Sequence, residues 1–533
     1  ALDEYEYWSR TCGPATKATY YYYLLLDLNQ GDSKLKAKFK KAEELSRDLE
    51  NDIQFFTLRL AKIAPAIQRE MLASKILAPY HHWLSRLFAE SAHLLSEGEE
   101  KILSLKSSTS YFNWVRLTTD LLGREEREIL DENGKKASGS LSSILGLLGS
   151  PKKKIRDTAA KGLNSILDKY LDVAEAEINS VLENHKINND LRKFDRADGA
   201  RLIEDNIDPE VVDTMLESVS RRFDITNKFY ALKAKLLKVD KLAYHERLVP
   251  YGKEELRFTY DEAVERVKKV FSNLDADFVD IFSELVEKGR VDVLPTKGKV
   301  TGGYCSPMII TDIPTYVLVN FTNTLHDVLT LAHEAGHTIN DELSKRAQNA
   351  LNQGEPKSVA EVASTYMQDF VLSDIASEAS EEAKLAILVR KIDDDISTVF
   401  RQVAAYRFEQ ELHRVFKETG HISKEDIGNM FKKHMAAYMG PAILQTKGCE
   451  NWWISWHHFR DPFYVYSYAS GQLISKAMQK ETKANPEFIL KVKEFLSAGT
   501  SDSPKNIFAK MGIDITRPDF WQEGLDEIEN NLI

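Results

Sequence analysis

Two histidines lie four positions apart in the segment from Leu325 to Asn340, which reads LHDVLTLAHEAGHTIN. The segment has no proline and has apolar residues at helical spacing, so we predict a helix. His333 and His337 then lie about one turn apart on the same face, where both imidazoles can reach one metal ion. Glu334 projects about 100° round the helix from His333, beside the metal and not onto it.

This spacing fits zinc chemistry on an amide bond. Zinc with three protein ligands keeps a fourth position for water and lowers the pKa of that water to about 7. A neighbouring carboxylate, here Glu334, takes the proton of the water and passes it to the leaving nitrogen. The alternative is two surface histidines without a metal. Gly336 counts against it, because glycine within a helix costs about 1 kcal/mol relative to alanine and indicates that another element approaches closely.

A third ligand is needed, and the helix predicted to begin after Pro356 offers Glu361. This glutamate lies among small and apolar residues, where an unpaired carboxylate would be costly to bury and a metal would remove that cost. The alternative is that Glu361 is simply exposed on one side of its helix. Other candidates in more solvated settings are Glu342, Glu355 and Glu378.

Several motifs together are similar to one family. The HEAGH motif is followed 24 residues later by the glutamate of EVAS, and this arrangement resembles the oligoendopeptidase F branch of the thimet oligopeptidase superfamily. The likeness is strongest from about Thr301 to Leu473. Its other motifs are Gly302–Cys305, Tyr316–Thr322, Trp456–Phe459 and Pro462–Gly471. The resemblance implies one zinc ion on His333, His337 and Glu361, with Glu334 as general base.

The segment from Trp456 to Gly471 is rich in histidine and tyrosine, which can donate hydrogen bonds to the oxyanion formed in amide hydrolysis. His458 resembles the substrate-binding histidine of the family, although His457 beside it is an alternative. The best candidates for the transition-state tyrosine are Tyr464 and Tyr466, with Tyr468 as a third. Each tyrosine could instead be an ordinary core residue.

Other polar groups are interpreted as structural. Glu409 and His413 are predicted to be a solvent-side or packing pair, and His81 with His82 is predicted to pack beside Trp83. The consecutive residues Asp393–Asp395 diverge round a helix and form no metal cage. Cys305 has no activating histidine nearby in the sequence.

Helical periodicity dominates the chain, and glycine and proline are scarce, so the fold is predicted to be mostly α. The clearest amphipathic stretches are 35–60, 97–105, 159–183, 209–239, 261–288 and 381–418.

One region has β character. Tyr316–Phe321 is predicted to be a strand, with Val291–Leu294 and Met308–Ile310 pairing near it. This small β element ends just before the histidine-bearing helix. We expect the strand Tyr316–Phe321 to pair with the backbone of a bound peptide.

We place a domain boundary near Asn188, which gives an N-terminal helical lobe (1–188) and a catalytic lobe (189–533). A loop is predicted at 145–154, where glycine, proline and three lysines follow one another. The family resemblance implies two helical lobes that enclose a deep channel. Such a channel would admit unfolded peptides and exclude folded proteins.

Composition limits the function further. The net charge of −11 argues against a nucleic-acid binder. The three cysteines, Cys12, Cys305 and Cys449, are no disulfide framework and fit a reducing compartment, so we expect a cytoplasmic protein. No apolar run is long enough for a membrane span, and we find no basic-then-apolar signal pattern. A leader removed before Ala1 stays compatible with the sequence.

The sequence therefore predicts a zinc-dependent oligoendopeptidase that acts on short unfolded peptides. A zinc exopeptidase or another amidohydrolase could use the same helix. A non-catalytic helical peptide-binding protein is a second alternative, and the presence of Glu334 argues against it.

Overall fold

The computed structural model describes residues 1–532 except 12–13, 54, 253–255, 301 and 309–312. Helices make up most of this part of the chain, and the strands are short. The mostly-α prediction is confirmed. Among the described residues, no helix combines the length and the apolar character needed to cross a membrane.

The chain divides into two compact units, each built from three separate segments. Unit 1 comprises 1–92, 254–379 and 474–515, and unit 2 comprises 93–253, 380–473 and 516–533. The predicted lobe boundary at residue 188 falls within helix α11 (Leu171–Arg192), where Asn188 and Asn189 hydrogen-bond to the carbonyl oxygens of Asn184 and Ala197. No break occurs there, and the division into lobes at 188 stays a prediction.

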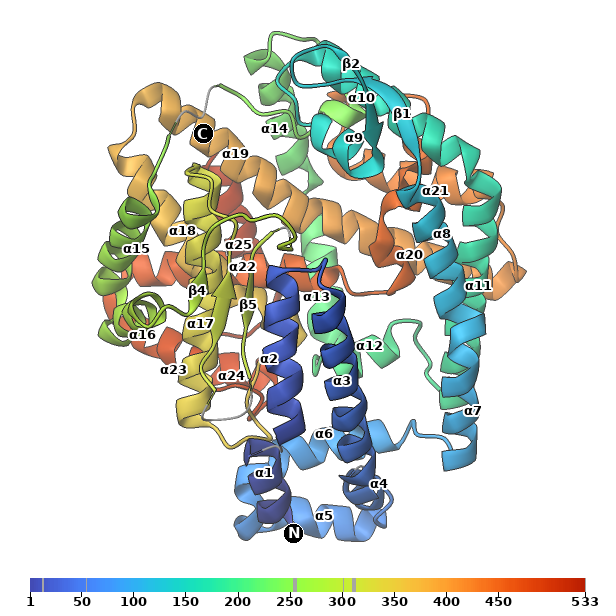
Figure 1. The fold of residues 1–533 in the computed structure, drawn as a ribbon, viewed down its shortest axis with the longest axis vertical. Helices are drawn as coiled ribbons and strands as arrows, with labels where there is room; N and C mark the ends of the chain where they lie inside the picture. Colours follow the sequence, from blue (N-terminus) through green and yellow to red (C-terminus); the bar gives the residue numbers. More distant parts are fainter. Residues whose placement is uncertain (12–13, 54, 253–255, 301, 309–312, 533) are drawn as a thin grey trace. The chain divides into compact units, whose positions relative to one another are not determined.

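Unit 1 holds the histidine-bearing helix and a small sheet. Its helices are α1 (Leu2–Thr11), α2 (Pro14–Leu28), α3 (Ser33–Ile53), α4 (Phe55–Ala61), α5 (Pro65–Ala73), η1 (Lys75–Tyr80), α6 (His81–Ser91), α15 (Tyr260–Leu274), α16 (Ala276–Glu287), α17 (Leu325–Ala347), η4 (Lys357–Val359), α18 (Glu361–Glu378), η8 (Pro486–Phe488), α23 (Ile489–Ser497), α24 (Pro504–Lys510) and the second part of α22 (Tyr466–Ala484). Figure 1 shows α2 and α3 as two long helices beside each other, in dark blue.

Unit 2 is also helical. Its elements are α7 (Glu97–Ser107), η2 (Ser108–Phe112), α8 (Asn113–Gly123), β1 (Glu126–Leu130), β2 (Lys136–Ser140), α9 (Leu141–Leu147), α10 (Lys153–Lys169), α11, α12 (Gly199–Glu204), α13 (Pro209–Arg221), α14 (Phe223–Leu236), β3 (Leu242–Ala243), η3 (Tyr244–Glu246), α19 (Glu381–Asp395), η5 (Ile396–Phe400), α20 (Arg401–Thr419), α21 (Lys424–Met439), β7 (Ile443–Leu444), η6 (Cys449–Ser455), η7 (His457–Arg460), the first part of α22 and α25 (Pro518–Asn530).

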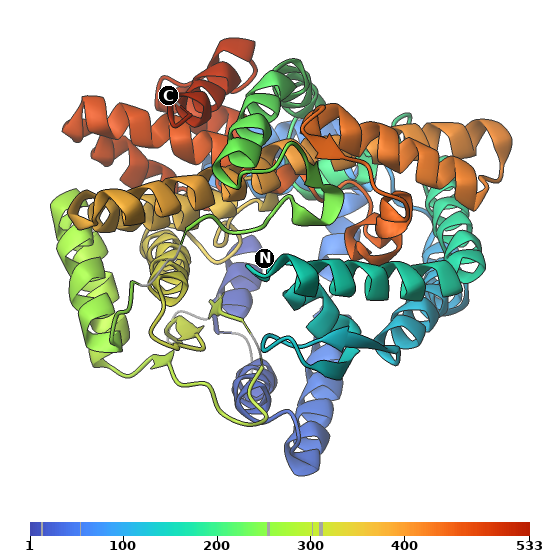
Figure 2. The same cartoon turned by 90° about the horizontal axis from the view of Figure 1, so that it is seen from above.

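Each predicted amphipathic stretch is helical over most of its described residues, although some contain breaks and residue 54 of the stretch 35–60 lies outside the described residues. The stretch 209–239 is two helices, α13 and α14, and 261–288 is α15 followed by α16. The stretch 381–418 is one continuous run in which a π-helical turn, η5, joins α19 to α20. This run is the long gold-to-orange helix in both views (Figures 1 and 2).

Helix α17 begins where the sequence supplies a capping box. The Thr324 hydroxyl accepts a hydrogen bond from the Asp327 N–H, and the Asp327 carboxylate accepts bonds from the backbone and hydroxyl of Thr322 and Thr324. Reciprocal bonds of this kind satisfy the first free N–H groups of a helix. They fix the start of the helix that carries the two histidines.

Gly336 permits close packing of α17 against α18. A Cβ atom at this position would lie 2.7 Å from both the Ala363 carbonyl oxygen and the Ser364 Cα. The prediction that another element approaches this glycine closely is confirmed.

The sheet beside α17 has three strands in the order β4–β6–β5. The strands are β4 (Val291–Asp292), β5 (Tyr304–Ser306) and β6 (Tyr316–Leu318); β6 pairs with β4 in parallel and with β5 antiparallel. The small β element is confirmed. The third strand is β5, while the predicted segment Met308–Ile310 extends into residues 309–312, which lie outside the described residues.

The expectation that the strand Tyr316–Phe321 pairs with a bound peptide is wrong for residues 316–318, which form β6. Backbone bonds from Val317, Val319 and Phe321 to β4 and its flanks occupy one side of the strand, and β5 occupies the other. A central strand has no free backbone groups to offer. In this sheet β5 and β4 are the edges.

The hairpin of β1 and β2 was not predicted. Its strands are joined through Asp131–Lys135, with Gly134 at φ 80° and the Asp131 carboxylate accepting bonds from the N–H groups of Asn133 and Lys135. The Asn133–Gly134 pair is a hairpin signal that would have found it.

Candidate active site

His333, Glu334 and His337 project from α17 in unit 1. The two imidazole centroids lie 5.0 Å apart. Glu334 is buried, and it accepts a hydrogen bond from the N–H of Cys305 in β5. Burial raises the pKa of the Glu334 carboxyl above its ordinary value, although His333 and His337 work in the opposite direction. A carboxylate held beside the two imidazoles can act as a proton acceptor for an attacking water.

Glu361 is the first residue of α18 and faces both histidines. Its Oε2 atom lies 3.3 Å from His333 Nε2 and 3.8 Å from His337 Nε2. One ligand atom from each of the three residues lies within 4.8 Å of the others. Two imidazole nitrogens and one carboxylate oxygen are the donor set of a catalytic zinc site with an open fourth position.

The outer nitrogen of each imidazole also has a partner. Gln368 Oε1 lies 2.9 Å from His333 Nδ1, and Glu355 Oε1 lies 3.7 Å from His337 Nδ1. Such partners fix the tautomer that leaves Nε2 free as a ligand. Ser364 likewise donates a hydrogen bond to Glu361 Oε2 at 3.1 Å. These residues fit a zinc ion.

Of the competing glutamates, Glu355 lies in a less solvated setting than predicted. It is partly buried, not solvated, its Oε2 has no hydrogen-bond partner, and burial raises its pKa. It lies beside the outer nitrogen of His337, so it supports a candidate ligand. Glu342 accepts bonds from Thr315 and Lys345 instead, and Glu378 pairs with Arg266 and Lys269 at the surface.

His458, Tyr464 and Tyr468 lie together in unit 2. The ring centroid of His458 is 6.0 Å from that of Tyr464 and 5.8 Å from that of Tyr468, and the two tyrosine rings are 5.5 Å apart. The Trp456 indole N–H donates to His458 Nδ1 at 3.1 Å, so the proton of the neutral imidazole is on Nε2. That nitrogen lies 3.3 Å from the Tyr468 hydroxyl.

Burial, together with His457 and Arg401, lowers the pKa of His458 to about 4. His458 is therefore a neutral hydrogen-bond donor at physiological pH. Its neighbour His457 is exposed, with its ring centroid 4.2 Å away. Of the adjacent pair, His458 has the geometry of a fixed donor.

Tyr466 does not lie in this cluster, and its predicted role at the transition state stays a prediction. Its side chain is fully buried, and its hydroxyl donates to Asp205 at 2.9 Å. Tyr464 lies just before α22 and Tyr468 lies within it, whereas Tyr466 is the first residue of that helix and its ring is in the core.

Two buried contacts that sequence reasoning missed hold this segment. Arg460 forms a bidentate ion pair with Glu177 at 2.7 and 3.0 Å. Phe463 has the left-handed φ of 63°, which is rare for a bulky residue, and its N–H donates to Glu409 at 3.0 Å. Glu409 and His413 are both buried, so the packing interpretation holds and the solvent-side one is wrong.

The remaining groups are structural. The Cys305 thiol contacts Thr338 and Asp341, and burial raises its pKa, so the thiol stays protonated. Asp393 pairs with Lys233, whereas Asp395 accepts a bond from Gln472, so these aspartates diverge as predicted. His81 bonds to the Ser74 carbonyl oxygen.

Asp157, His245 and Glu246 form a second acidic and histidine cluster. Lys153 lies within 3.1 Å of both carboxylates, and Arg156 lies 2.8 Å from Glu246. These cations already balance the charge, so the cluster is a structural ion-pair network.

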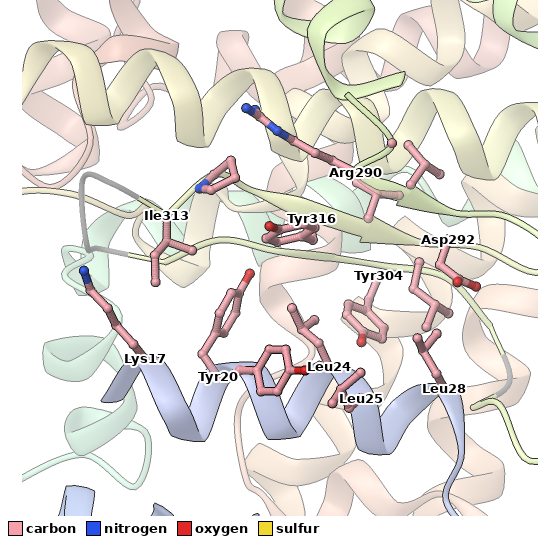
Figure 3. A pocket seen from close by; sticks show the side chains of 16 residues that line it. Lys17, Tyr20, Leu24, Leu25, Leu28, Arg290, Asp292, Tyr304, Ile313 and Tyr316 are labelled. Carbon is pink, nitrogen blue, oxygen red and sulfur yellow. The ribbon is translucent and has the colours of Figure 1, made fainter. Parts of the chain in front are cut away.

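A cavity of about 500 Å³ lies between α2 and the sheet of unit 1. Figure 3 shows Tyr20, Leu24 and Leu28 of α2 pointing toward Tyr304 and Tyr316 of the strands. None of the predicted site residues lines it.

Comparisons with known proteins agree on one family. The model described as "Peptidase family M3" matches residues 147–527, and the model described as "Oligopeptidase F" matches residues 60–124. Similar curated proteins include the plasmid oligoendopeptidase F of Lactococcus lactis subsp. cremoris, 25% identical over 489 residues that cover 90% of this chain and 80% of the relative. Oligopeptidase PepF of Bacillus subtilis is 26% identical over 485 residues, which cover 88% of this chain and 71% of the relative.

Solved structures share the fold. The crystal structure of oligoendopeptidase-F from Enterococcus faecium has a TM-score of 0.73 at 21% identity and covers 97% of this chain and 89% of that one. A structure described as a candidate peptidase from Chlamydophila abortus has a TM-score of 0.88 at 24% identity and covers 96% and 87% of the two chains.

Proposed function

The chain belongs to peptidase family M3 and is a metallo-oligopeptidase of the oligoendopeptidase F group, and on that premise we propose that it hydrolyses internal bonds of short peptides at a zinc site. In this proposal His333, His337 and Glu361 bind the zinc ion, and Glu334 is the general base.

One observation carries the proposal. The ligand atoms of His333, His337 and Glu361 converge within 4.8 Å, while Gln368 and Glu355 lie beside the opposite nitrogens of the two imidazoles. Zinc in such a site supplies Lewis acidity that polarises a carbonyl and acidifies water. The Glu334 carboxylate, adjacent in the chain to one ligand, takes a proton from the attacking water and delivers it to the leaving nitrogen.

His458 and the two tyrosines of its cluster act on the substrate. The fixed Nε2–H of His458 and the hydroxyl of Tyr464 or Tyr468 donate hydrogen bonds to the peptide carbonyl oxygen, which gains negative charge as the bond breaks. The pairing of His458 Nδ1 with Trp456 supports this role, because it keeps the Nε2 proton in place.

Substrates in this proposal are short and unfolded, and a folded protein with the same cleavable sequence is not hydrolysed. We also propose a cytoplasmic location. The described cysteines, Cys305 and Cys449, are both free thiols, which is typical of reducing compartments, and Cys12 lies outside the described residues.

The test is hydrolysis of a quenched fluorescent peptide of about ten residues, a length chosen for an enclosed site. Activity should disappear with phenanthroline and return with zinc. Glu334→Gln should lower kcat by roughly 10²- to 10⁴-fold while the protein still binds zinc. Chelator-resistant turnover, or a variant as active as the wild type, would refute the assignment.

A zinc exopeptidase would use the same four residues, so the position of cleavage decides between the two activities. Products from peptides of increasing length, identified by mass spectrometry, should show internal cuts. Release of single residues or of dipeptides from one end only would favour the exopeptidase.

A further inference from the structure

Among the described residues, no carboxylate pairs with the guanidinium of Arg401. It is the first residue of α20, directly after the π-helical turn η5, and it is partly exposed. Its guanidinium carbon lies 4.0 Å from the centroid of the Trp456 ring, and its Nε atom is buried without a hydrogen-bond partner. π-Helical turns within longer helices are frequent at functional sites, where they redirect a side chain.

A second unpaired guanidinium lies near it. Arg247 is buried over the rings of Tyr244 and Trp452, at 4.6 and 5.3 Å from their centroids. One of its nitrogens donates to the Tyr244 carbonyl oxygen, and its Nε has no partner. Burial and the charge of Arg247 lower the pKa of Arg401. Within the described part of the chain, neither arginine forms an ion pair with an aspartate or glutamate.

Stacking on aromatic rings does not balance these charges. A cation over an aromatic face recovers only part of the cost of removing a guanidinium from water, and two like charges add repulsion to that cost. Buried arginines are normally paired with a carboxylate or phosphate. The region therefore has the chemistry of an anion site whose anion does not come from the described residues.

The position of Arg401 connects it to the substrate. The indole that it covers donates to His458, the residue proposed to bind the peptide carbonyl. Asp461, whose negative charge raises the pKa of His458, is already paired with Arg201. An incoming carboxylate would therefore meet Arg401 without an internal competitor.

We propose that Arg401, with Arg247 close to it, forms a subsite beside His458 that binds a carboxylate of the peptide substrate. This inference rests on the proposed function, because it assumes that His458 contacts the peptide. The carboxylate is either the C-terminus of the peptide or an acidic side chain. Arginine suits both, since its planar fork of N–H groups matches the two oxygens of a carboxylate.

The experiment compares matched peptides. One pair differs only in a C-terminal carboxylate or carboxamide, and a second series replaces Asp or Glu by Asn or Gln at each position. The ratio of kcat/KM for acid over amide should exceed one in the wild type. In Arg401→Gln the ratio should fall by roughly 10- to 100-fold, mainly through KM, with Arg401→Lys intermediate. Arg414→Gln, an exposed arginine of the same helix paired with Glu418, should keep the wild-type ratio.

If the acid-over-amide ratio exceeds one in the C-terminal pair, the carboxylate is the C-terminus of the peptide. If it exceeds one in the Asp and Glu series, the carboxylate is an acidic side chain. A ratio of one in both series of the wild type overturns the proposal, and so does a ratio that persists in Arg401→Gln. If Arg401 only holds Trp456 by stacking, the variant loses activity equally on acid and amide peptides, and this outcome also overturns it.

Binding separates this inference from the proposed function. Dissociation constants of the same peptide pairs with the Glu334→Gln protein, measured by fluorescence anisotropy, need no turnover. Selective binding of the acid that is lost in Glu334→Gln/Arg401→Gln supports the subsite even if no peptide is cleaved. Equal affinity for acid and amide overturns the subsite even if the wild type proves to be an active peptidase.

Discussion

Glu355 and Gln368 show how the candidate zinc ligands are held. Each lies beside the imidazole nitrogen that faces away from the convergence of the three ligand atoms, one at 3.7 Å from His337 and the other at 2.9 Å from His333. Partners of this kind orient a metal-binding histidine and make it more basic.

Replacing Glu355 with glutamine should therefore weaken zinc binding by roughly 10- to 100-fold. Competition with a fluorescent zinc chelator measures the dissociation constant directly. Glu342→Gln is the matched control, because that carboxylate is bound by Thr315 and Lys345 and does not contact a histidine. Equal dissociation constants for the wild type and Glu355→Gln would show that Glu355 does not support His337.

Phenylalanine variants of Tyr464 and Tyr466 should differ, one in catalytic rate and the other in stability. Tyr464→Phe removes a candidate donor beside His458, and kcat should fall by roughly 10²-fold. Tyr466→Phe removes a buried hydroxyl that donates to Asp205, so the free energy of unfolding should fall by about 1–3 kcal/mol while kcat/KM stays near the wild-type value. Steady-state kinetics and urea unfolding of both variants check this. A larger kinetic effect for Tyr466→Phe would contradict this expectation.

At the scale of elements, the packing of α17 against α18 sets the distance between the histidines and Glu361. Gly336→Ala would place a methyl group 2.7 Å from the backbone of α18, only a few residues after Glu361. We expect a loss of about 1–3 kcal/mol in unfolding free energy from overpacking. Zinc affinity should fall as well, because the carboxylate moves with its helix.

Gly146→Ala in α9 is the control for this variant. A Cβ atom there would meet nothing within 4 Å, so alanine should stabilise the helix by up to about 1 kcal/mol. Both effects are measured by chemical unfolding of the zinc-loaded proteins. An unchanged stability and zinc affinity in Gly336→Ala would mean that the two helices can separate without cost.

The free energy of unfolding should depend on pH through two histidines where α11 packs against α20. His185 and His413 are in edge-to-face contact with ring centroids 4.8 Å apart, and burial lowers the pKa of both, that of His413 most strongly. Below pH of about 6.5 the unfolded chain gains protons that the folded protein does not bind. The folded state therefore loses stability as pH falls, by at most about 1.4 kcal/mol per pH unit for each such proton.

His413→Phe should make this slope shallower between about pH 6.5 and 5. Denaturant unfolding at several pH values gives the slope. His421→Gln, which replaces an exposed histidine, should leave it unchanged. Identical slopes for His413→Phe and the wild type would show that His413 does not titrate differently in the two states.

The sequence could predict features that depend on residues close together in the chain, but not contacts between residues far apart in it. The three residues on α17 follow from helix periodicity, and Gly336 indicated that another element approaches closely, without identifying it as α18. Gln368 and the supporting role of Glu355 were not predicted, because these two residues are 35 and 18 positions from the histidines they contact, on α18 and in a loop. Tyr466 was a candidate because of its residue type, whereas its burial and its bond to Asp205 depend on packing against residues 261 positions away.

At the scale of the whole molecule, the candidate residues come from both units. The metal-binding set and Glu334 are in unit 1, and His458, Tyr464 and Tyr468 are in unit 2. Each unit is assembled from three segments of the chain, and the predicted lobe boundary at residue 188 stays a prediction. Arg401 and Arg247 also belong to unit 2, so the proposed carboxylate subsite can be described within that unit alone.

Zinc should also stabilise the protein as a whole. Glu334, Glu355 and Glu361 gather round two imidazoles in unit 1, and the unfolded chain holds no such arrangement. A ligand that binds only the folded state stabilises it by about 2.7 kcal/mol at a concentration of 100 times its dissociation constant. Removing zinc with phenanthroline should therefore lower Tm by roughly 2–3 °C in differential scanning calorimetry, and adding zinc should restore it. His333→Gln has one ligand fewer, so its Tm should respond far less to the chelator. An equal shift in that variant would place the stabilising metal elsewhere in the molecule.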